Sequence, residues 1–258
     1  MNDLITALTE LAGVSQDMIW IGFFVFLRVG AAMAVLPAFG EQVVPQRIRL
    51  CLGLAFTAIV APLVAADLPG PQTGLPLALV TETVAGLVLG LALRFFIHAL
   101  QTAGMMIAQA TSLSQLFVGA GADPLPAIGN LLTVAGLALA VATGLHLRLI
   151  EYFIGSYEVF PPGRLPLPAD LARWGVAGVG QSFALAFSLA APFLIASFIY
   201  NLALGVINRA MPQLMVAFVG TPAIALGSMA LLIIGAPLAL TVWRRALDGF
   251  LSAPFVIP

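Results

Sequence analysis

Four charged side chains stand inside or between long apolar runs of the sequence: Arg28, Glu82, Arg94 and Arg209. A charge at the centre of a membrane helix costs at least about 2.5 to 3.5 kcal/mol unless it meets a partner or water. These side chains therefore either form structural ion pairs, within the chain or between subunits, or line an aqueous path. The sequence favours structural pairing and does not choose the partners.

Residue patterns typical of an intramembrane enzyme are missing from the sequence. It has no HExxH motif, no GxSxG motif, no pair of aspartates within apolar segments and no GxxxxGK[ST] nucleotide-binding loop. Cys51 is the only cysteine, so the chain can form neither an internal disulfide nor a thiolate metal site. We therefore expect no catalytic residues, no cofactor and no metal, and a protein that is not an enzyme.

The composition is that of an integral membrane protein. Of 258 residues, 61% are hydrophobic and only 8% are charged, and the mean hydropathy is +1.09. About six membrane helices, each needing roughly 20 apolar residues, fit into this length. The net charge of -1 lacks the excess of basic residues that nucleic-acid binding requires. Membrane lipid is therefore an expected partner, and nucleic acid is not.

The apolar segments predict an all-α fold of about six long helical segments arranged as broken hairpins. Pro37 should kink or end the first helix, and the polar stretch that follows the fourth, up to about Arg173, should lie at a membrane interface. Gly86 and Gly90 form a small-xxx-small pair, which suits close packing of helices in lipid. The predicted helices cover residues 18–40, 50–66, 77–110, 127–147, 175–208 and 210–242.

Basic residues give conflicting signals for the orientation of these segments. Arg47 and Arg49 favour a cytoplasmic turn after the first segment, but six alternating spans then place Arg244 and Arg245 on the opposite side. Irregular backbone at membrane depth is tolerated only where protein covers it or where it lines a cavity. We therefore expect broken helices packed in a hetero-oligomeric complex.

A loop over residues 112–126 combines glycine, serine and proline with apolar side chains. Flexible thioethers and a phenylalanine ring at this loop could close a gap around a moving chain, and the glycines would let the loop move. Ordinary core packing is an equally available interpretation. The candidate gating residues are Met105, Met106, Ser112, Leu113, Leu116, Phe117, Gly119 and Gly121.

Three stretches together carry a family resemblance. They are FLRVGAAMAVLPAFGEQVVPQRIRL at residues 26–50, ETVAGLVLGLALRF at residues 82–95 and LALGVINRAMPQLMVAFVGTP at residues 202–222. In combination they resemble the FliR family of flagellar type III export-gate subunits, and the resemblance covers nearly the whole chain. The injectisome counterpart shares much of the pattern, but VINRAMPQL is more similar to the flagellar branch. Met215 departs from the asparagine that we expect there.

The resemblance implies a single membrane domain over residues 1–258 that joins FliP-like and FliQ-like subunits, with FlhB nearby. Unfolded export substrates would pass through the centre of this complex, in the bacterial inner membrane at the flagellar basal body. The family further implies that residues 112–126 plug the closed channel. It also implies that segments with the hydropathy of membrane spans are lifted and broken inside the assembly.

A secondary transporter for a small solute is the alternative function. Arg28, Glu82 and Arg94 would then line a site near the middle of the membrane. Such transporters usually contain two repeated halves, and we find no convincing internal repeat. Purification separates the two hypotheses, because a gate subunit copurifies with FliP-like and FliQ-like chains.

Overall fold

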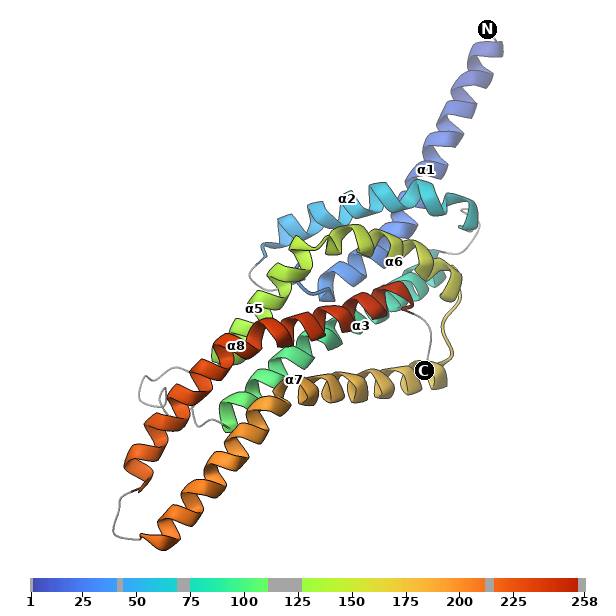
Figure 1. The fold of residues 1–258 in the computed structure, drawn as a ribbon. Helices are drawn as coiled ribbons and strands as arrows, with labels where there is room; N and C mark the ends of the chain where they lie inside the picture. The colour runs from blue at the N-terminus through green and yellow to red at the C-terminus, as the bar shows by residue number, and fades with distance from the viewer. Residues whose placement is uncertain (1, 41–43, 69–74, 111–126, 212–215, 255–258) are drawn as a thin grey trace. The chain divides into compact units, whose positions relative to one another are not determined.

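The computed structural model describes residues 2–40, 44–68, 75–110, 127–211 and 216–254. Within these ranges the chain is helical and contains no strand, which confirms the predicted all-α class (Figure 1). Five of the helices are long and apolar enough to cross a membrane. The elements are α1 (Asn2–Val35), α2 (Gln46–Val64), the short 3-10 helix η1 (Ala65–Asp67), α3 (Leu75–Ala110), α5 (Ala127–Ala142), α6 (Leu145–Val159), α7 (Pro168–Ala210) and α8 (Val216–Ser252).

The first two helices end close to where the sequence predicts, but α1 begins at Asn2, well before the predicted start at residue 18. Helix α1 ends at Val35, just before Pro37, as expected from the missing proline N–H. Helix α2 begins earlier than predicted, at Gln46, so Arg47 and Arg49 belong to its first turn and not to a polar turn. Pro45 precedes it with φ −55°, a backbone angle that suits the entry into a helix.

The predicted fourth helix is divided at Gly144. This residue has φ +89°, a left-handed conformation that glycine adopts without steric cost, and it separates α5 from α6. The stretch that follows was predicted as a polar segment at a membrane interface, and its place at an interface stays a prediction. It forms the helix α6, whose buried residues recur with helical spacing at Leu145, Leu149, Tyr152, Phe153 and Ser156.

The chain forms two compact units. The first comprises residues 1–94, 144–175 and 251–258, and the second comprises residues 95–143 and 176–250. Helices α3 and α7 each contribute residues to both units. The assignment of the whole chain to one domain stays a prediction.

In the first unit, α3 packs closely on α1 at two glycines. A Cβ atom on Gly86 would overlap the carbonyl oxygen of Arg28 and lie 2.9 Å from the Cβ of Ala31. A Cβ on Gly90 would lie 2.7 Å from the carbonyl oxygen of Ala32. Because real Cβ atoms do not come this close, only glycine permits this separation of the two helices.

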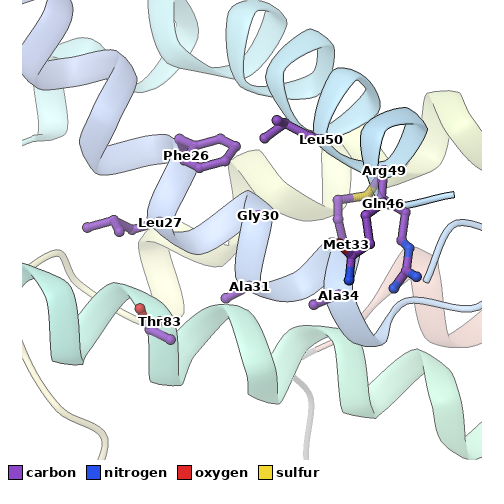
Figure 2. A pocket seen from close by; sticks show the side chains of 11 residues that line it. Phe26, Leu27, Gly30, Ala31, Met33, Ala34, Gln46, Arg49, Leu50 and Thr83 are labelled. Atoms are coloured by element: carbon purple, nitrogen blue, oxygen red, sulfur yellow. The ribbon is translucent and has the colours of Figure 1, made fainter.

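Helix α2 lies against α1 and α6 in the same unit. The ring of Phe56 on α2 lies edge-on to Phe39 and to Phe153 of α6, with ring centroids 6.1 Å and 6.2 Å apart. Beside these contacts, a cavity of about 400 Å³ opens between α1, α2 and α3, bordered by Gly30 and Thr83 (Figure 2). The aromatic contacts fix α2, and the cavity shows that the packing is incomplete.

The second unit is built around Trp243 of α8. Its side chain is buried, and its indole N–H donates a hydrogen bond to the carbonyl oxygen of Phe96 at 2.8 Å. Gly136 of α5 lies close to the same indole ring. Helices α3 and α5 meet where a Cβ on Gly104 would overlap the backbone of Gly129. Small residues again allow the helices to approach closely.

Many apolar side chains of α7 and α8 are not covered by the chain itself. Ile233 and Ile234 of α8, for example, are 75% and 76% exposed. Exposed apolar surface of this extent marks contacts with membrane or with other proteins. On α7 it comprises Val176, Val179, Phe183, Phe187, Ile195, Phe198, Ile199, Leu202, Val206 and Ile207.

Candidate functional site

Arg28 of α1 is the centre of a buried polar cluster in the first unit. It is 0% exposed, and each of its guanidinium nitrogens has a partner. Nε donates to Oε2 of Glu82 at 2.8 Å, Nη1 to Oγ of Ser156 at 3.1 Å and Nη2 to the carbonyl oxygen of Phe160 at 2.8 Å. The guanidinium therefore joins α1, α3, α6 and the segment that follows α6.

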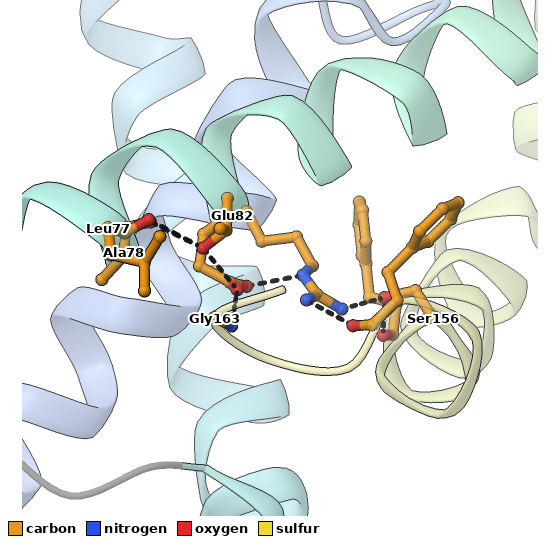
Figure 3. Close-up of polar contacts among 9 residues, drawn as sticks. Leu77, Ala78, Glu82, Ser156 and Gly163 are labelled. Atoms are coloured by element: carbon orange, nitrogen blue, oxygen red, sulfur yellow. Dashed lines mark hydrogen bonds and ion pairs between the residues drawn. The ribbon is translucent and has the colours of Figure 1, made fainter. Parts of the chain in front are cut away.

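Glu82 of α3 completes the ion pair from the other side (Figure 3). Its second oxygen, Oε1, accepts a hydrogen bond from the backbone N–H of Gly163 at 3.2 Å. Gly163 has φ +73° and is the third residue of a turn that is closed by a bond from the N–H of Arg164 to the carbonyl oxygen of Pro161. The proline-glycine turn thus aims a backbone donor at the carboxylate.

Tyr157 covers the ion pair with its aromatic ring. The Arg28 guanidinium carbon lies 3.7 Å from the ring centroid, which is the geometry of a cation–π contact. The phenol oxygen is buried and has no hydrogen-bond partner among the described residues. A neighbouring contact comes from Tyr152, whose hydroxyl donates to the carbonyl oxygen of Leu89 at 3.2 Å. Both tyrosines connect α6 to the rest of the unit.

This geometry supports a structural role for the pair and offers little to a substrate. All three guanidinium nitrogens and both carboxylate oxygens already have protein partners. A buried pair with this full set of hydrogen bonds is satisfied, whereas a pair stripped of one partner leaves an uncompensated charge. The cluster therefore holds α6 and the turn at Gly163 against α1 and α3.

The other predicted intramembrane charges lie elsewhere. Arg94 is partly buried, and its Nη1 donates to the carbonyl oxygen of Val35 at 3.1 Å, beside the end of α1. Arg209 is exposed in the last turn of α7, where a cation interacts favourably with the helix dipole. The structure thus brings Arg28 and Glu82 together, whereas Arg94 binds a backbone carbonyl and Arg209 belongs to the second unit.

The candidate gating residues fall mostly outside the described part of the chain. Ser112, Leu113, Leu116, Phe117, Gly119 and Gly121 all belong to residues 111–126, which the structure does not describe. Met105 and Met106 are placed in the last turns of α3, with Met105 42% exposed and Met106 partly buried. The proposed plug is therefore a matter for experiment.

Ser156, Tyr157, Phe160 and Gly163 are the residues that the sequence did not connect with Arg28. They lie 128 residues or more after it in the chain, and their contacts run through backbone atoms as often as through side chains. The sequence identifies a charge that needs partners. It does not show which backbone group is the partner, because nearly every residue has both a carbonyl and an N–H group. The helical spacing of buried residues in α6 was the one available signal.

Comparison with known proteins supplies the family. Residues 19–250 match the family model described as bacterial export proteins, family 1. The chain is similar to the flagellar biosynthetic protein FliR of Caulobacter vibrioides, with 36% identity over 90% of this chain and 96% of that protein. It is 30% identical to FliR of Escherichia coli over 80% of this chain and 81% of the relative. It is 28% identical to FliR of Bacillus subtilis over 77% of this chain and 79% of that protein.

Proposed function

Because the chain belongs to the family of bacterial export proteins, family 1, we propose that it is a non-enzymatic subunit of the flagellar protein export gate. The observation that carries this proposal is the similarity to flagellar FliR proteins over nearly the full length of the chain. The composition and the five long apolar helices make it a membrane protein. We place it in the bacterial inner membrane, at the basal body.

Its proposed role is to build part of the channel through which unfolded flagellar proteins leave the cell. At a rise of 1.5 Å per residue, the 43 residues of α7 and the 37 of α8 extend over about 64 Å and about 55 Å. The hydrocarbon core of a membrane is only about 30 Å thick. The bilayer cannot bury all of the exposed apolar side chains on helices of this length. We propose that FliP-like and FliQ-like subunits and FlhB bury the rest.

The channel needs a closure between export events, and residues 112–126 are the proposed plug. Support comes from their composition, in which Leu116 and Phe117 stand near Gly119 and Gly121. The exposed thioether of Met105, about two helical turns before this segment, could add to the seal. Deleting residues 112–121 should leave the assembly intact and make the membrane leak ions.

A transporter for small solutes receives less support from the geometry. The side chains that would have lined its site, Arg28 and Glu82, are bound to each other and to neighbouring protein groups. Arg94 donates to a helix-end carbonyl. A solute-binding site needs polar groups that are free to turn toward the solute.

Copurification from membranes is the direct test of the proposed function. A tagged chain, extracted in mild detergent, should elute with FliP-like and FliQ-like subunits, and a strain without the chain should fail to export flagellar proteins. A chain that elutes alone, remains stable and transports a metabolite would contradict the proposal. Arg209→Gln is a suitable control variant, because Arg209 is exposed in the last turn of α7.

A further inference from the structure

Two cavities lie end to end along the contact between α1 and α2 in the first unit. The first, of about 400 Å³, is bordered on α2 by residues from Gln46 to Gly53. The second, of about 780 Å³, is bordered on α2 by residues from Leu54 to Ala65. Phe26 of α1 borders both. We call the pair the α1–α2 groove; it follows the whole length of α2, and each part has the size of a small-molecule site.

The walls of the groove are apolar, and small residues give it depth. A Cβ atom on Gly22 would meet no atom within 4 Å, so this position opens directly into the second cavity. Thr57 borders that cavity, but its hydroxyl already donates to the carbonyl oxygen of Gly53 at 2.7 Å. The interior of the groove therefore suits a hydrocarbon chain better than a polar ligand.

Positive charge gathers at one end of the groove. Figure 2 shows Gln46 and Arg49 beside Met33 at this end of the first cavity. Nε of Arg49 donates to the carbonyl oxygen of Val44 at 3.1 Å, and its terminal nitrogens have no partner among the described residues. Arg47 lies exposed in the same turn. The first turn of α2 has no acidic residue and no side-chain cap, so its helix dipole adds to the positive field.

We infer that the α1–α2 groove binds an anionic phospholipid, with an acyl chain in the groove and the phosphate beside Arg47 and Arg49. One leaflet contributes about 15 Å of hydrocarbon, which corresponds to about ten residues of a helix. Measured from Arg49, this length reaches the level of Ile59, through the first cavity and into the second. The inference requires a membrane around α2 and does not depend on the role in export.

Charge complementarity favours a lipid over a helix from another protein. An apolar helix could fill the groove, but it offers no anionic partner to the guanidinium of Arg49. A phospholipid satisfies both ends of the groove at once, because its acyl chain is apolar and its phosphate accepts hydrogen bonds from arginine.

Lipid retention by the purified protein, with whatever subunits it keeps, tests the inference. The sample is exchanged into detergent containing equal amounts of phosphatidylglycerol and phosphatidylcholine, and the bound lipid is counted by native mass spectrometry. The wild-type protein should retain phosphatidylglycerol preferentially. The variants Arg47→Gln and Arg49→Gln should each lower this retention by about fivefold, the factor for one basic residue beside an anionic lipid.

Two further variants separate the groove from general effects. Gly22→Leu adds a side chain where a Cβ meets no atom within 4 Å, so it extends into the second cavity and should lower the retention of both lipids. Gly155→Leu and Arg209→Gln are matched controls outside the groove and should retain lipid like the wild type, since Gly155 also has open space and Arg209 is exposed. Equal retention of phosphatidylglycerol in all variants overturns the inference.

Crosslinking identifies the occupant of the groove directly. A photoreactive benzophenone side chain in place of Gly22 points into the second cavity. On irradiation in the membrane it should attach to a phospholipid, which adds the mass of one lipid to the chain. Attachment to another polypeptide instead shows that a partner helix occupies the groove, and overturns the inference.

Discussion

Replacing Arg28 by methionine should destabilise the first unit far more than any other arginine substitution in the chain. Methionine has a similar length and no charge, so it fills the space and removes the donors. Glu82 then loses its cation, and the carbonyl oxygen of Phe160 and the hydroxyl of Ser156 lose their guanidinium donors. The carboxylate is left buried with the N–H of Gly163 as its remaining backbone donor.

The expected loss follows from the burial of this pair. Removing one member of a buried ion pair costs about 3 to 5 kcal/mol, because the other charge stays without compensation. The contact with the ring of Tyr157, 3.7 Å from the guanidinium, is lost as well. These contributions are not additive, so we expect a decrease of about 3 to 5 kcal/mol in the free energy of unfolding. The double variant Arg28→Met with Glu82→Leu should recover part of this loss.

Unfolding in mixed micelles, with increasing denaturing detergent, measures the free energy for the wild type and the variants. Hydrogen exchange of the backbone amides of α6 provides a local measurement, because Ser156 lies on this helix and the cluster holds it in place. Arg209→Met is the matched control and should change stability by less than about 0.5 kcal/mol. The reasoning is refuted if Arg28→Met and Arg209→Met have the same small effect.

Three further predictions concern packing and closure. Gly86→Ala should lower the free energy of unfolding by about 1 to 3 kcal/mol, because its Cβ meets the backbone of α1, whereas Gly155→Ala, with open space around it, should be neutral or stabilising. Trp243→Phe should destabilise the second unit by at least about 1 kcal/mol through the lost hydrogen bond to Phe96 and the smaller ring; an unchanged thermal unfolding midpoint would contradict this. Deletion of residues 112–121 should raise the ion conductance of reconstituted gates without changing subunit composition, and unchanged conductance would count against the plug.

The sequence predicts the helices well wherever hydropathy and proline act alone. The third segment was expected over residues 77–110, and α3 runs over Leu75–Ala110. The end of α1 before Pro37 follows from the proline ring. Such features are local, because a residue type and its immediate neighbours determine them.

Prediction fails where tertiary contacts decide. The partner of Arg28 lies 54 residues away, and hydropathy indicates only that the charge needs compensation. Similarly, α6 contains Glu151 and Arg148, which made it appear to be a polar interface segment, although its other face is buried. The sequence does not show that Gly144, among the many glycines of the chain, is the one that breaks a helix, because its φ angle depends on the folded structure.

The break at Gly144 affects how many times the chain crosses the membrane. Helices α5 and α6 have 16 and 15 residues, and each is shorter than the roughly 20 residues that one crossing needs. The pair is bent by 78° and would add a sixth crossing only if it spans the membrane as one broken unit. With the five long helices alone, the chain crosses an odd number of times. The start of α2, which contains Arg47, and the end of α8, which contains Arg244, then lie on the same side of the membrane. This agrees with the preference of basic residues for the cytoplasmic side. An impermeant thiol reagent should therefore reach cysteines introduced beside both arginines from the same face of the membrane.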